Sequence, residues 1–178
     1  MKKRILKVGV MGPGESARTI DMILAKYLGV LIAEQEWILL SGGGSNGVMG
    51  EVNNGYKFKG GKLSIGISPF EGYEMSDNVD LIISTNMRSG RNYINALSCD
   101  VLIAIGNLSS AGTLSEVALR LTKSKSGKKD TFPVILLGEG PIVEALVKFY
   151  GDRVLHVTSA DMAIAEILKL LESDFSRI

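Results

Sequence analysis

The sequence predicts an α/β protein with a Rossmann-like, doubly wound and mainly parallel sheet of about seven strands, covered by helices on both faces. Short apolar runs alternate with helical patterns from one end of the chain to the other. The runs are apolar at nearly every position, which is typical of strands buried on both faces. With 178 residues, 46% of them hydrophobic, the chain suffices for about one domain. We therefore expect residues 1–178 to form a single domain.

Each element follows from a local pattern. Apolar runs of three to five residues read as strands because they are too short for helices, and they occupy residues 8–11, 37–40, 63–67, 81–83, 101–105, 134–137 and 154–157. Apolar residues at helical spacing, such as Ile20, Leu24 and Leu31 in the first helix, predict helices over residues 17–35, 47–58, 92–98, 114–122, 142–149 and 161–171. Residues 69–78 and the lysine-rich residues 123–130 are expected to be loops.

Composition excludes several classes of protein. Lys+Arg 20 against Asp+Glu 19 gives a net charge of +1, so we expect no nucleic-acid partner and no membrane partner. No apolar run is long enough for a transmembrane helix. A single cysteine, Cys99, rules out an internal disulfide and leads us to expect a cytoplasmic protein without a metal site. His156 lies in a run expected to be buried, which favours a core histidine.

Two glycine-rich segments follow the first two expected strands. Glycine makes up 21 of the 178 residues. In an open parallel sheet, ligands bind where strands end and helices begin, and glycine lets the backbone approach a phosphate. We therefore expect a phosphate-bearing ligand to contact Gly12, Gly14, Gly42, Gly43, Gly44, Asn46 and Gly47. For Gly12 and Gly14 a tight turn is an equal alternative, whereas the glycines of residues 42–47 exceed what a turn needs.

These segments match the dinucleotide fingerprint only in part. Residues 12–17 fit G-x-G-x-x-A and residues 42–47 fit G-x-G-x-x-G. The fingerprint also needs an acid about 20 residues further on, at the end of the next strand. After the first segment that place holds Leu40 and Ser41, and after the second Glu71 lies in a loop. The pattern therefore disfavours an NAD site.

A third junction, after the fifth expected strand, adds charged candidates. Gly112 and Thr113 would begin a helix and present N–H groups and a hydroxyl to an anion. Glu116 is either a functional carboxylate or the second half of a capping box with Thr113. Arg88 and Arg91 begin the preceding helix, where a guanidinium is unfavourable unless an anion is present. We expect them to clamp a phosphate, with a solvent-exposed surface arginine as an equal alternative for Arg91 and a stronger one for Arg88.

These motifs resemble the Lonely Guy (LOG) family of Rossmann-like proteins, which were once mislabelled lysine decarboxylases. Residues 42–50, Gly-Gly-Gly-Ser-Asn-Gly-Val-Met-Gly, are similar to the GGGxxGLMG loop of that family. Arg91-Asn92 and residues 112–116, Gly-Thr-Leu-Ser-Glu, resemble its arginine and Gly-Thr-x-x-Glu motifs, in forms that look closest to the molybdenum cofactor carrier branch. The similarity runs from about residue 7 to residue 158.

The resemblance implies two alternative functions. In LOG enzymes, which hydrolyse the N-glycosidic bond of nucleoside 5′-monophosphates, the matching Glu116 and Arg91 would be the catalytic residues. In the carrier branch, the same surface would bind a pterin–phosphate cofactor without chemistry. We favour a binding protein for a phosphorylated nucleotide or pterin-type ligand, a nucleoside monophosphate or the molybdenum cofactor, and leave open whether it is an enzyme. Residues 106–112 form a longer turn than in the family, and Asn92 replaces the enzymes' lysine. The resemblance also implies a homodimer or larger homo-oligomer.

Overall fold

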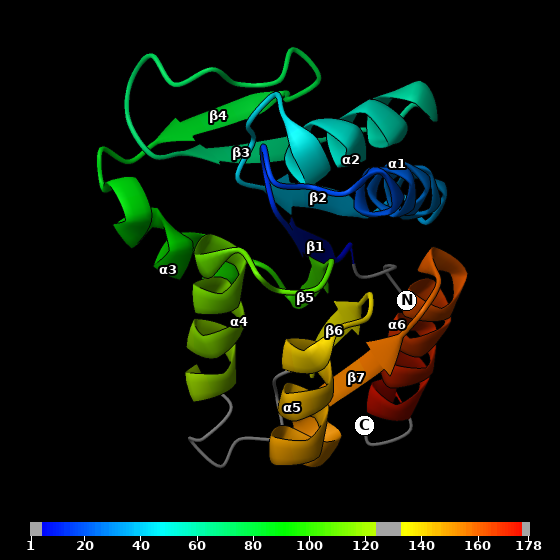
Figure 1. The fold of residues 1–178 in the computed structure, drawn as a ribbon. Coiled ribbons are helices and arrows are strands. Elements are labelled where there is room, and N and C mark those ends of the chain that lie inside the picture. The colour runs from blue at the N-terminus through cyan, green and yellow to red at the C-terminus, as the bar shows by residue number, and fades with distance from the viewer. Residues whose placement is uncertain (1–4, 124–132, 176–178) are drawn as a thin grey trace.

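The computed structural model describes residues 5–123 and 133–175, and its strands form one sheet (Figure 1). The strand order is β4–β3–β2–β1–β5–β6–β7, and neighbouring strands are parallel. The strands are β1 (Lys7–Met11), β2 (Ile38–Ser41), β3 (Ser64–Ser68), β4 (Leu81–Ser84), β5 (Val101–Ile105), β6 (Val134–Leu137) and β7 (Val154–Val157). The expected Rossmann-like architecture of about seven parallel strands is thereby confirmed.

The helices alternate with the strands, close to where the sequence predicts them. They are α1 (Thr19–Glu34), α2 (Gly47–Phe58), α3 (Arg91–Ser98), α4 (Ala111–Lys123), α5 (Pro141–Tyr150) and α6 (Ala160–Phe175), with 3-10 turns η1 (Arg88–Gly90) and η3 (Gly151–Arg153). The largest differences are the start of α4, three residues before the expected position, and the end of α6, four residues after it. Of the expected lysine-rich loop, residues 124–130 lie outside the described residues.

The sheet separates two hydrophobic cores, one under each helical layer. β5 shows the division most clearly, since all five of its side chains are buried. Because successive side chains point to opposite faces, Val101, Ile103 and Ile105 pack with α1, α2 and α6. Leu102 and Ala104 pack with α3, α4 and α5 on the other face. The doubly wound arrangement therefore buries the central strands on both sides.

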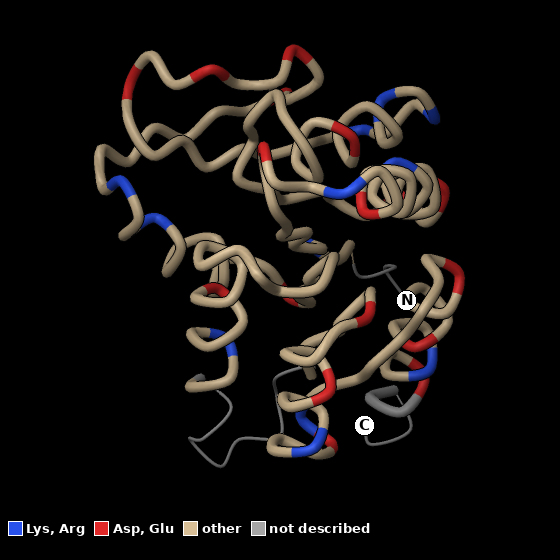
Figure 2. The backbone as a smooth tube through the Cα atoms, in the orientation of Figure 1, with Lys and Arg blue, Asp and Glu red and all other residues tan. Residues whose placement is uncertain are grey.

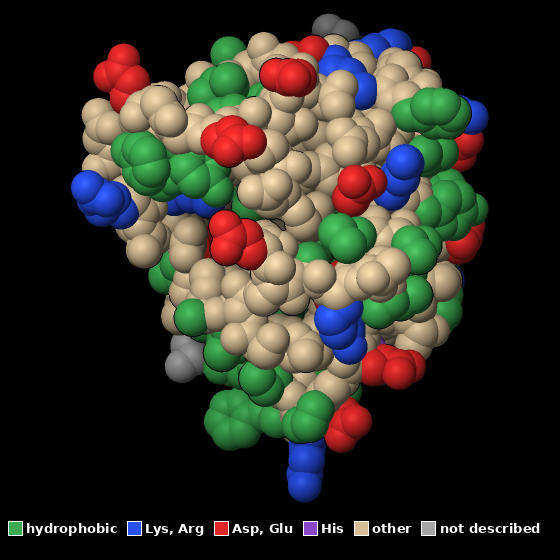
Figure 3. Space-filling model, turned by 45° about the horizontal axis from the view of Figure 1, so that its top comes forward, with side chains coloured by type: hydrophobic (Ala, Val, Ile, Leu, Met, Phe, Trp, Pro, Cys, Tyr) green, Lys and Arg blue, Asp and Glu red, His purple; other side chains and the backbone are tan. Residues whose placement is uncertain are grey.

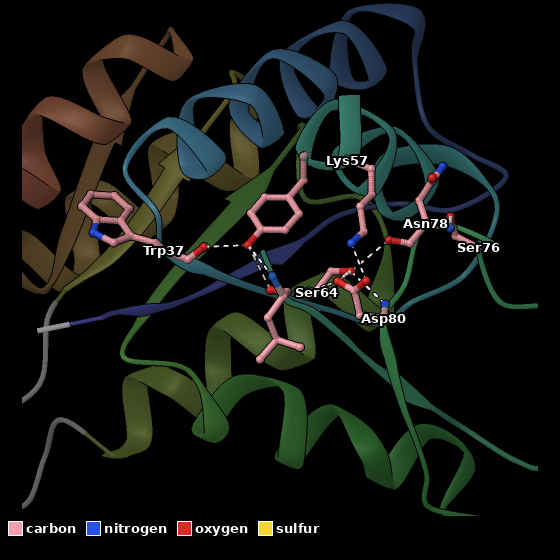
Figure 4. Close-up of polar contacts among 8 residues, drawn as sticks. Trp37, Lys57, Ser64, Ser76, Asn78 and Asp80 are labelled. Atoms are coloured by element: carbon pink, nitrogen blue, oxygen red, sulfur yellow. Dashed lines mark hydrogen bonds and ion pairs between the residues drawn. The ribbon is translucent and has the colours of Figure 1, made fainter. Parts of the chain in front are cut away.

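A polar cluster fastens β3 to its neighbours at the end of the sheet away from the glycine-rich loops (Figure 4). The buried Tyr56 hydroxyl of α2 donates to the carbonyl oxygen of Trp37 at 2.8 Å and accepts the amide of Leu63 at 3.1 Å. Asp80, just before β4, accepts the amide of Ser64 at 2.7 Å. These bonds fix the lateral positions of β2, β3 and β4 before the strands run toward the opposite edge.

Single-residue expectations have different outcomes. Cys99 is buried, and burial raises the pKa of its thiol, which makes this cysteine a weak nucleophile. The expectation of a core histidine is wrong, because β7 is an edge strand and His156 is exposed there, with Nε2 2.8 Å from the carbonyl oxygen of Gly138. Among residues 5–123 and 133–175, no helix combines the length and apolar character needed to cross a bilayer.

Candidate functional site

A cavity of about 140 Å³ lies where the loops after β1, β2 and β5 meet the start of α3. The strand order reverses direction between β1 and β5, with β2 to β4 on one side and β6 and β7 on the other. In open α/β sheets this switch point is where the carboxyl ends of the strands form a crevice for ligands. The cavity therefore lies at the position where open α/β folds bind small molecules.

The structure gathers part of the predicted site around this cavity and leaves part outside it. The lining includes seven of the candidate residues: Gly12, Gly14, Gly42, Arg91, Gly112, Thr113 and Glu116. The other five are not among the lining residues: Gly43, Gly44, Asn46, Gly47 and Arg88. Within the second glycine-rich segment, Gly42 lines the cavity, whereas Gly43, Gly44, Asn46 and Gly47 lie outside its lining.

The glycines at the α2 end of that segment serve close packing. Gly47 has a φ of +60°, which side chains rarely adopt, and a Cβ there would overlap the carbonyl oxygens of Pro13 and Gly14. The amide of Gly43 donates to the hydroxyl of Ser41 at 3.0 Å, and Asn53 donates to the same hydroxyl at 3.1 Å. These bonds tie the β2 loop to α2, and the amide of Val48 donates to the carbonyl oxygen of Pro13 at 3.0 Å, which joins the β1 and β2 loops.

The side chains of Arg88 and Arg91 have different surroundings, although the two residues are close in sequence. Arg88 is exposed in η1, with its guanidinium carbon 5.8 Å from the ring centre of Phe70. Arg91 begins α3 and turns inward, and its guanidinium donates to the carbonyl oxygens of Gly42, at 2.7 Å, and Ile67. The η1 turn rotates the chain between the two residues, so the structure provides one inward arginine rather than a pair.

Arg91 brings a positive charge to a partly enclosed wall of the cavity. Burial lowers the pKa of its guanidinium, and the charge of Glu116 opposes that shift. The Tyr73 ring centre lies 5.9 Å from its guanidinium carbon. Bonds to two backbone carbonyls fix the guanidinium without neutralising it, because carbonyl oxygens carry no formal charge. The cation is therefore positioned and available to attract an anion.

Glu116 is the buried acid of the site. Its Oε1 accepts a hydrogen bond from Asn95 Nδ2 at 2.7 Å. Burial raises the pKa of Glu116 to about 7, while the bond from Asn95 and the charge of Arg91 favour the carboxylate. The capping-box alternative is wrong, because α4 begins at Ala111 and Thr113 already lies within its first turn. Glu116 thus changes charge near neutral pH beside the cavity.

Four lining residues were not among the candidates: Met11, Met49, Asn92 and Ser110. The two methionines supply an apolar wall, and Asn92 donates to the Ser115 hydroxyl at 2.8 Å. Two of them could have been identified from their places at strand-to-helix junctions, because Met11 ends β1 and Ser110 directly precedes α4. Among the described residues, no three His, Cys, Asp or Glu side chains come together in a way that could hold a metal ion.

Comparison with known proteins identifies the family. The model of the SLOG cluster4 family matches residues 5–164. This chain belongs to the SLOG cluster4 family. The resemblance to LOG-like proteins is thereby confirmed, and the match covers the whole of the cavity lining.

Two solved structures of molybdenum cofactor proteins align with nearly the whole chain, and a sequence relative aligns with most of it. The molybdenum cofactor binding protein of Rippkaea orientalis is 40% identical, with a TM-score of 0.85, over 96% of this chain and 99% of that one. The molybdenum cofactor carrier protein of Chlamydomonas reinhardtii is 38% identical, with a TM-score of 0.82, over 95% and 99%. An uncharacterised protein of Archaeoglobus fulgidus is 36% identical over 135 residues, 76% of this chain and 86% of that protein. The SLOG cluster4 chain is therefore similar to carrier proteins in both sequence and fold.

Proposed function

We propose that this SLOG cluster4 protein is a carrier that binds the phosphate-bearing end of a molybdenum-cofactor-type ligand in the cavity at the switch point. The observation that carries the proposal is the meeting of the Arg91 guanidinium and the start of α4 around that cavity. A cation and helix N–H groups that converge on one space form an anion site. Likeness to two molybdenum cofactor proteins over almost the full chain supports this choice of ligand.

The shape of the cavity suits a phosphate group better than a whole cofactor. Its volume of about 140 Å³ is below the roughly 300–1,000 Å³ of sites that enclose complete small molecules. A Cβ built on Gly14 or Gly112 would find its nearest neighbour 3.8 Å away, an ordinary van der Waals contact, and both residues line the cavity. We expect the phosphate to enter between them and the pterin to extend outside. A carrier holds its cofactor unchanged, so no reaction step is required of Arg91 or Glu116.

Glu116 couples phosphate binding to pH. A carboxylate beside a bound phosphate is repelled by it, so the bound anion favours the protonated acid. The pKa of Glu116 is already raised to about 7 by burial. We therefore expect affinity for the phosphate to fall as pH rises through about 7, and expect Glu116→Gln to remove that dependence.

A second candidate function is the phosphoribohydrolase reaction of LOG enzymes. It is favoured by one observation, that Glu116 and Arg91 line the same cavity. Glycosidic cleavage needs an ionised carboxylate near the anomeric carbon. Its rate would therefore rise with pH through about 7, whereas phosphate affinity of a carrier would fall. The two functions thus predict pH profiles of opposite sign.

Calorimetric titration separates these alternatives. The probes are the molybdenum cofactor released from a molybdoenzyme, and AMP, which is also assayed for release of free adenine. We expect the cofactor to bind without turnover and Arg91→Met to weaken binding at least tenfold. Arg88→Met is the matched control, because Arg88 lies outside the cavity lining, and it should leave affinity unchanged.

Two results would contradict the carrier proposal. One is equal cofactor affinity in the wild type and Arg91→Met, provided that both melt at similar temperatures. The other is adenine release from AMP that is lost in Glu116→Gln, which would establish the hydrolase instead. The proposal takes the protein to act in the cytoplasm on a phosphorylated small molecule, and takes it to be a homo-oligomer.

A further inference from the structure

A second cavity, of about 230 Å³, lies at the same edge of the sheet as the first, where β6 and β7 end and α1 begins. Three separate segments supply its lining: Arg18, Ile20 and Leu24 at the start of α1, Gly138 and Glu139 between β6 and α5, and Thr158 between β7 and α6. None of these residues lines the cavity proposed for the phosphate. The volume is smaller than that of sites that enclose complete small molecules, so the cavity suits a single ring system.

The two cavities are neighbours along this edge. Gly14 lines the first and Arg18 lines the second. The amide of Ala17 donates to the carbonyl oxygen of Gly14 at 3.0 Å, so residues 14–17 form a tight turn whose end Cα atoms lie within about 7 Å of each other. One further residue adds about 3.8 Å. The backbones of Gly14 and Arg18 are therefore no more than about 11 Å apart.

The turn between β5 and α4 adjoins both cavities. Its end at Ser110, with Gly112 of α4, lines the first cavity. Its beginning packs against the second, because a Cβ on Gly138 would lie 2.6 Å from the carbonyl oxygen of Gly106. A ligand that lies along this turn can therefore contact both cavities, with a phosphate at one end and a ring at the other.

The second cavity combines a fixed guanidinium with a carboxylate. Arg18 donates through Nε and Nη2 to the two side-chain oxygens of the buried Asp21, at 2.9 and 2.7 Å. Nη1 has no acceptor among the residues that the structure describes. The hydrogen bonds to Asp21 raise the pKa of Arg18, and the charge of Glu139 acts in the same direction. Glu139 is exposed and forms no ion pair within residues 5–123 and 133–175, so its carboxylate is available to a ligand.

These groups are complementary to the pyrimidine end of a pterin. That ring carries an amino group and a ring N–H side by side, and a carboxylate such as Glu139 can accept both at once. Ile20, which is 52% exposed, and Leu24 offer apolar surface to the face of the ring. Figure 2 shows the cationic position at the start of α1 and the acidic position on the loop that follows β6. The face of the molecule seen in Figure 3 carries a cationic side chain with hydrophobic side chains and an acidic one beside it.

From this arrangement we infer that the second cavity holds the pterin ring of the ligand whose phosphate occupies the first, with Glu139 as the specificity-determining residue that accepts the amino group and ring N–H. Nη1 of Arg18 and the hydroxyl of Thr158 supply donors for the carbonyl oxygen of the ring. The link between the two cavities rests on the proposed function, whereas the ring site can be tested without a phosphate. Guanine has the same pair of donors, so the test includes both rings.

Fluorescence titration of the full chain with 6-hydroxymethylpterin, which has the ring but no phosphate, tests the ring site. The matched probe is 6-hydroxymethyllumazine, in which a carbonyl oxygen replaces the amino group and would be repelled by a carboxylate. We expect the wild type to bind the pterin roughly tenfold more tightly than the lumazine, and Glu139→Gln to lose this preference, because its amide can donate to a carbonyl. Glu144→Gln removes an exposed carboxylate outside the lining, and it should keep the preference.

Two further measurements distinguish failure of this inference from failure of the carrier proposal. Arg91→Met should leave the affinity for 6-hydroxymethylpterin unchanged, because Arg91 does not line the second cavity. Glu139→Gln should weaken cofactor binding in calorimetry while leaving the affinity for inorganic phosphate unchanged. A pterin preference that depends on Glu139 would support the ring site even if cofactor binding proved independent of Arg91, which would contradict the carrier proposal alone.

Three results would overturn the inference. The first is a wild type that does not bind 6-hydroxymethylpterin or that binds the lumazine equally well. The second is a Glu139→Gln variant that keeps the wild-type preference, which would leave the carrier proposal in place. The third is tighter binding of guanosine than of 6-hydroxymethylpterin, which would assign the second cavity to a purine instead.

Discussion

The β2–α2 and β5–α4 junctions are both glycine-rich strand-to-helix turns at the same edge of the sheet, but Gly47 in the first and Gly112 in the second have different structural roles. At the first, Gly47 adopts a left-handed conformation against the carbonyl oxygens of Pro13 and Gly14. At the second, Gly112 lines the cavity, and a Cβ there would make only ordinary contacts, the nearest at 3.8 Å. Similar motifs thus provide close packing at Gly47 and a part of the cavity wall at Gly112.

Their buried polar groups differ in the same way. At the first junction Asn53 donates to the Ser41 hydroxyl, which in turn accepts the amide of Gly43. At the second, Asn95 donates to Glu116, an acid whose pKa is raised by burial. The first network joins neutral groups. The second retains a titratable group at a cost in stability, which is expected of a functional site.

The largest effect should come from the packing glycine. Gly47→Ala should destabilise the protein by about 3–4 kcal/mol, because left-handed strain adds to overlap with two carbonyl oxygens. Urea unfolding would measure the loss. A change within 1 kcal/mol would mean that the first junction is as open as the second, and the contrast between the two would fail.

The next effect on stability should come from Glu116→Gln, which we expect to stabilise the protein where Gly47→Ala destabilises it. Its pKa rises from an ordinary 4.5 to about 7 on folding, so the folded state binds the proton more tightly. Stability is therefore lost as pH rises from about 4.5 to about 7, by about 3 kcal/mol in all. The Glu116→Gln variant does not lose this stability, because glutamine does not ionise. Relative to the wild type it should melt higher at pH 8, with a smaller difference at pH 5, and an equal difference at both values would refute the assignment.

A smaller effect, a shift in the pKa of Glu116 when Asn95 is replaced, should show that Asn95 is a positioning residue for this carboxylate. Removing a hydrogen bond to the carboxylate disfavours the charged form, so Asn95→Leu should raise the pKa of Glu116 by about one unit. Carbon-13 NMR of labelled glutamate side chains would follow it, with Glu116→Gln assigning the resonance. The matched control is Asn53→Leu at the first junction, which should reduce stability but leave this titration in place.

The smallest effect on stability is expected at the cavity glycine. A Cβ at Gly112 would be 3.8 Å from its nearest neighbour, and alanine suits the first turn of a helix, so Gly112→Ala should change stability by less than about 0.5 kcal/mol. It should nevertheless weaken cofactor binding in calorimetry, because the methyl group would enter the space assigned to the phosphate. Unchanged affinity would show that the ligand does not approach α4.

Much of the fold could be predicted because its signals are local. Runs such as Val101–Ile105 are apolar at every position, which only a strand covered on both sides explains. The start of α4 could not be predicted, because Ser110, Ala111 and Gly112 carry no apolar periodicity that would mark the beginning of a helix. The exposed position of His156 escaped prediction because its neighbours look the same in a central strand and an edge strand.

The sequence by itself determined the α/β class, the alternation of elements and the set of residues near the carboxyl edge, since these depend on hydrophobic periodicity and glycine placement. Only the tertiary structure decided which of those residues face a common space. It turned Arg91 inward and Arg88 outward, assigned Gly47 to packing and Gly112 to the cavity, and buried Glu116 until its pKa approached 7. The physical reason is that burial, charge and side-chain direction depend on neighbours that are distant in the chain.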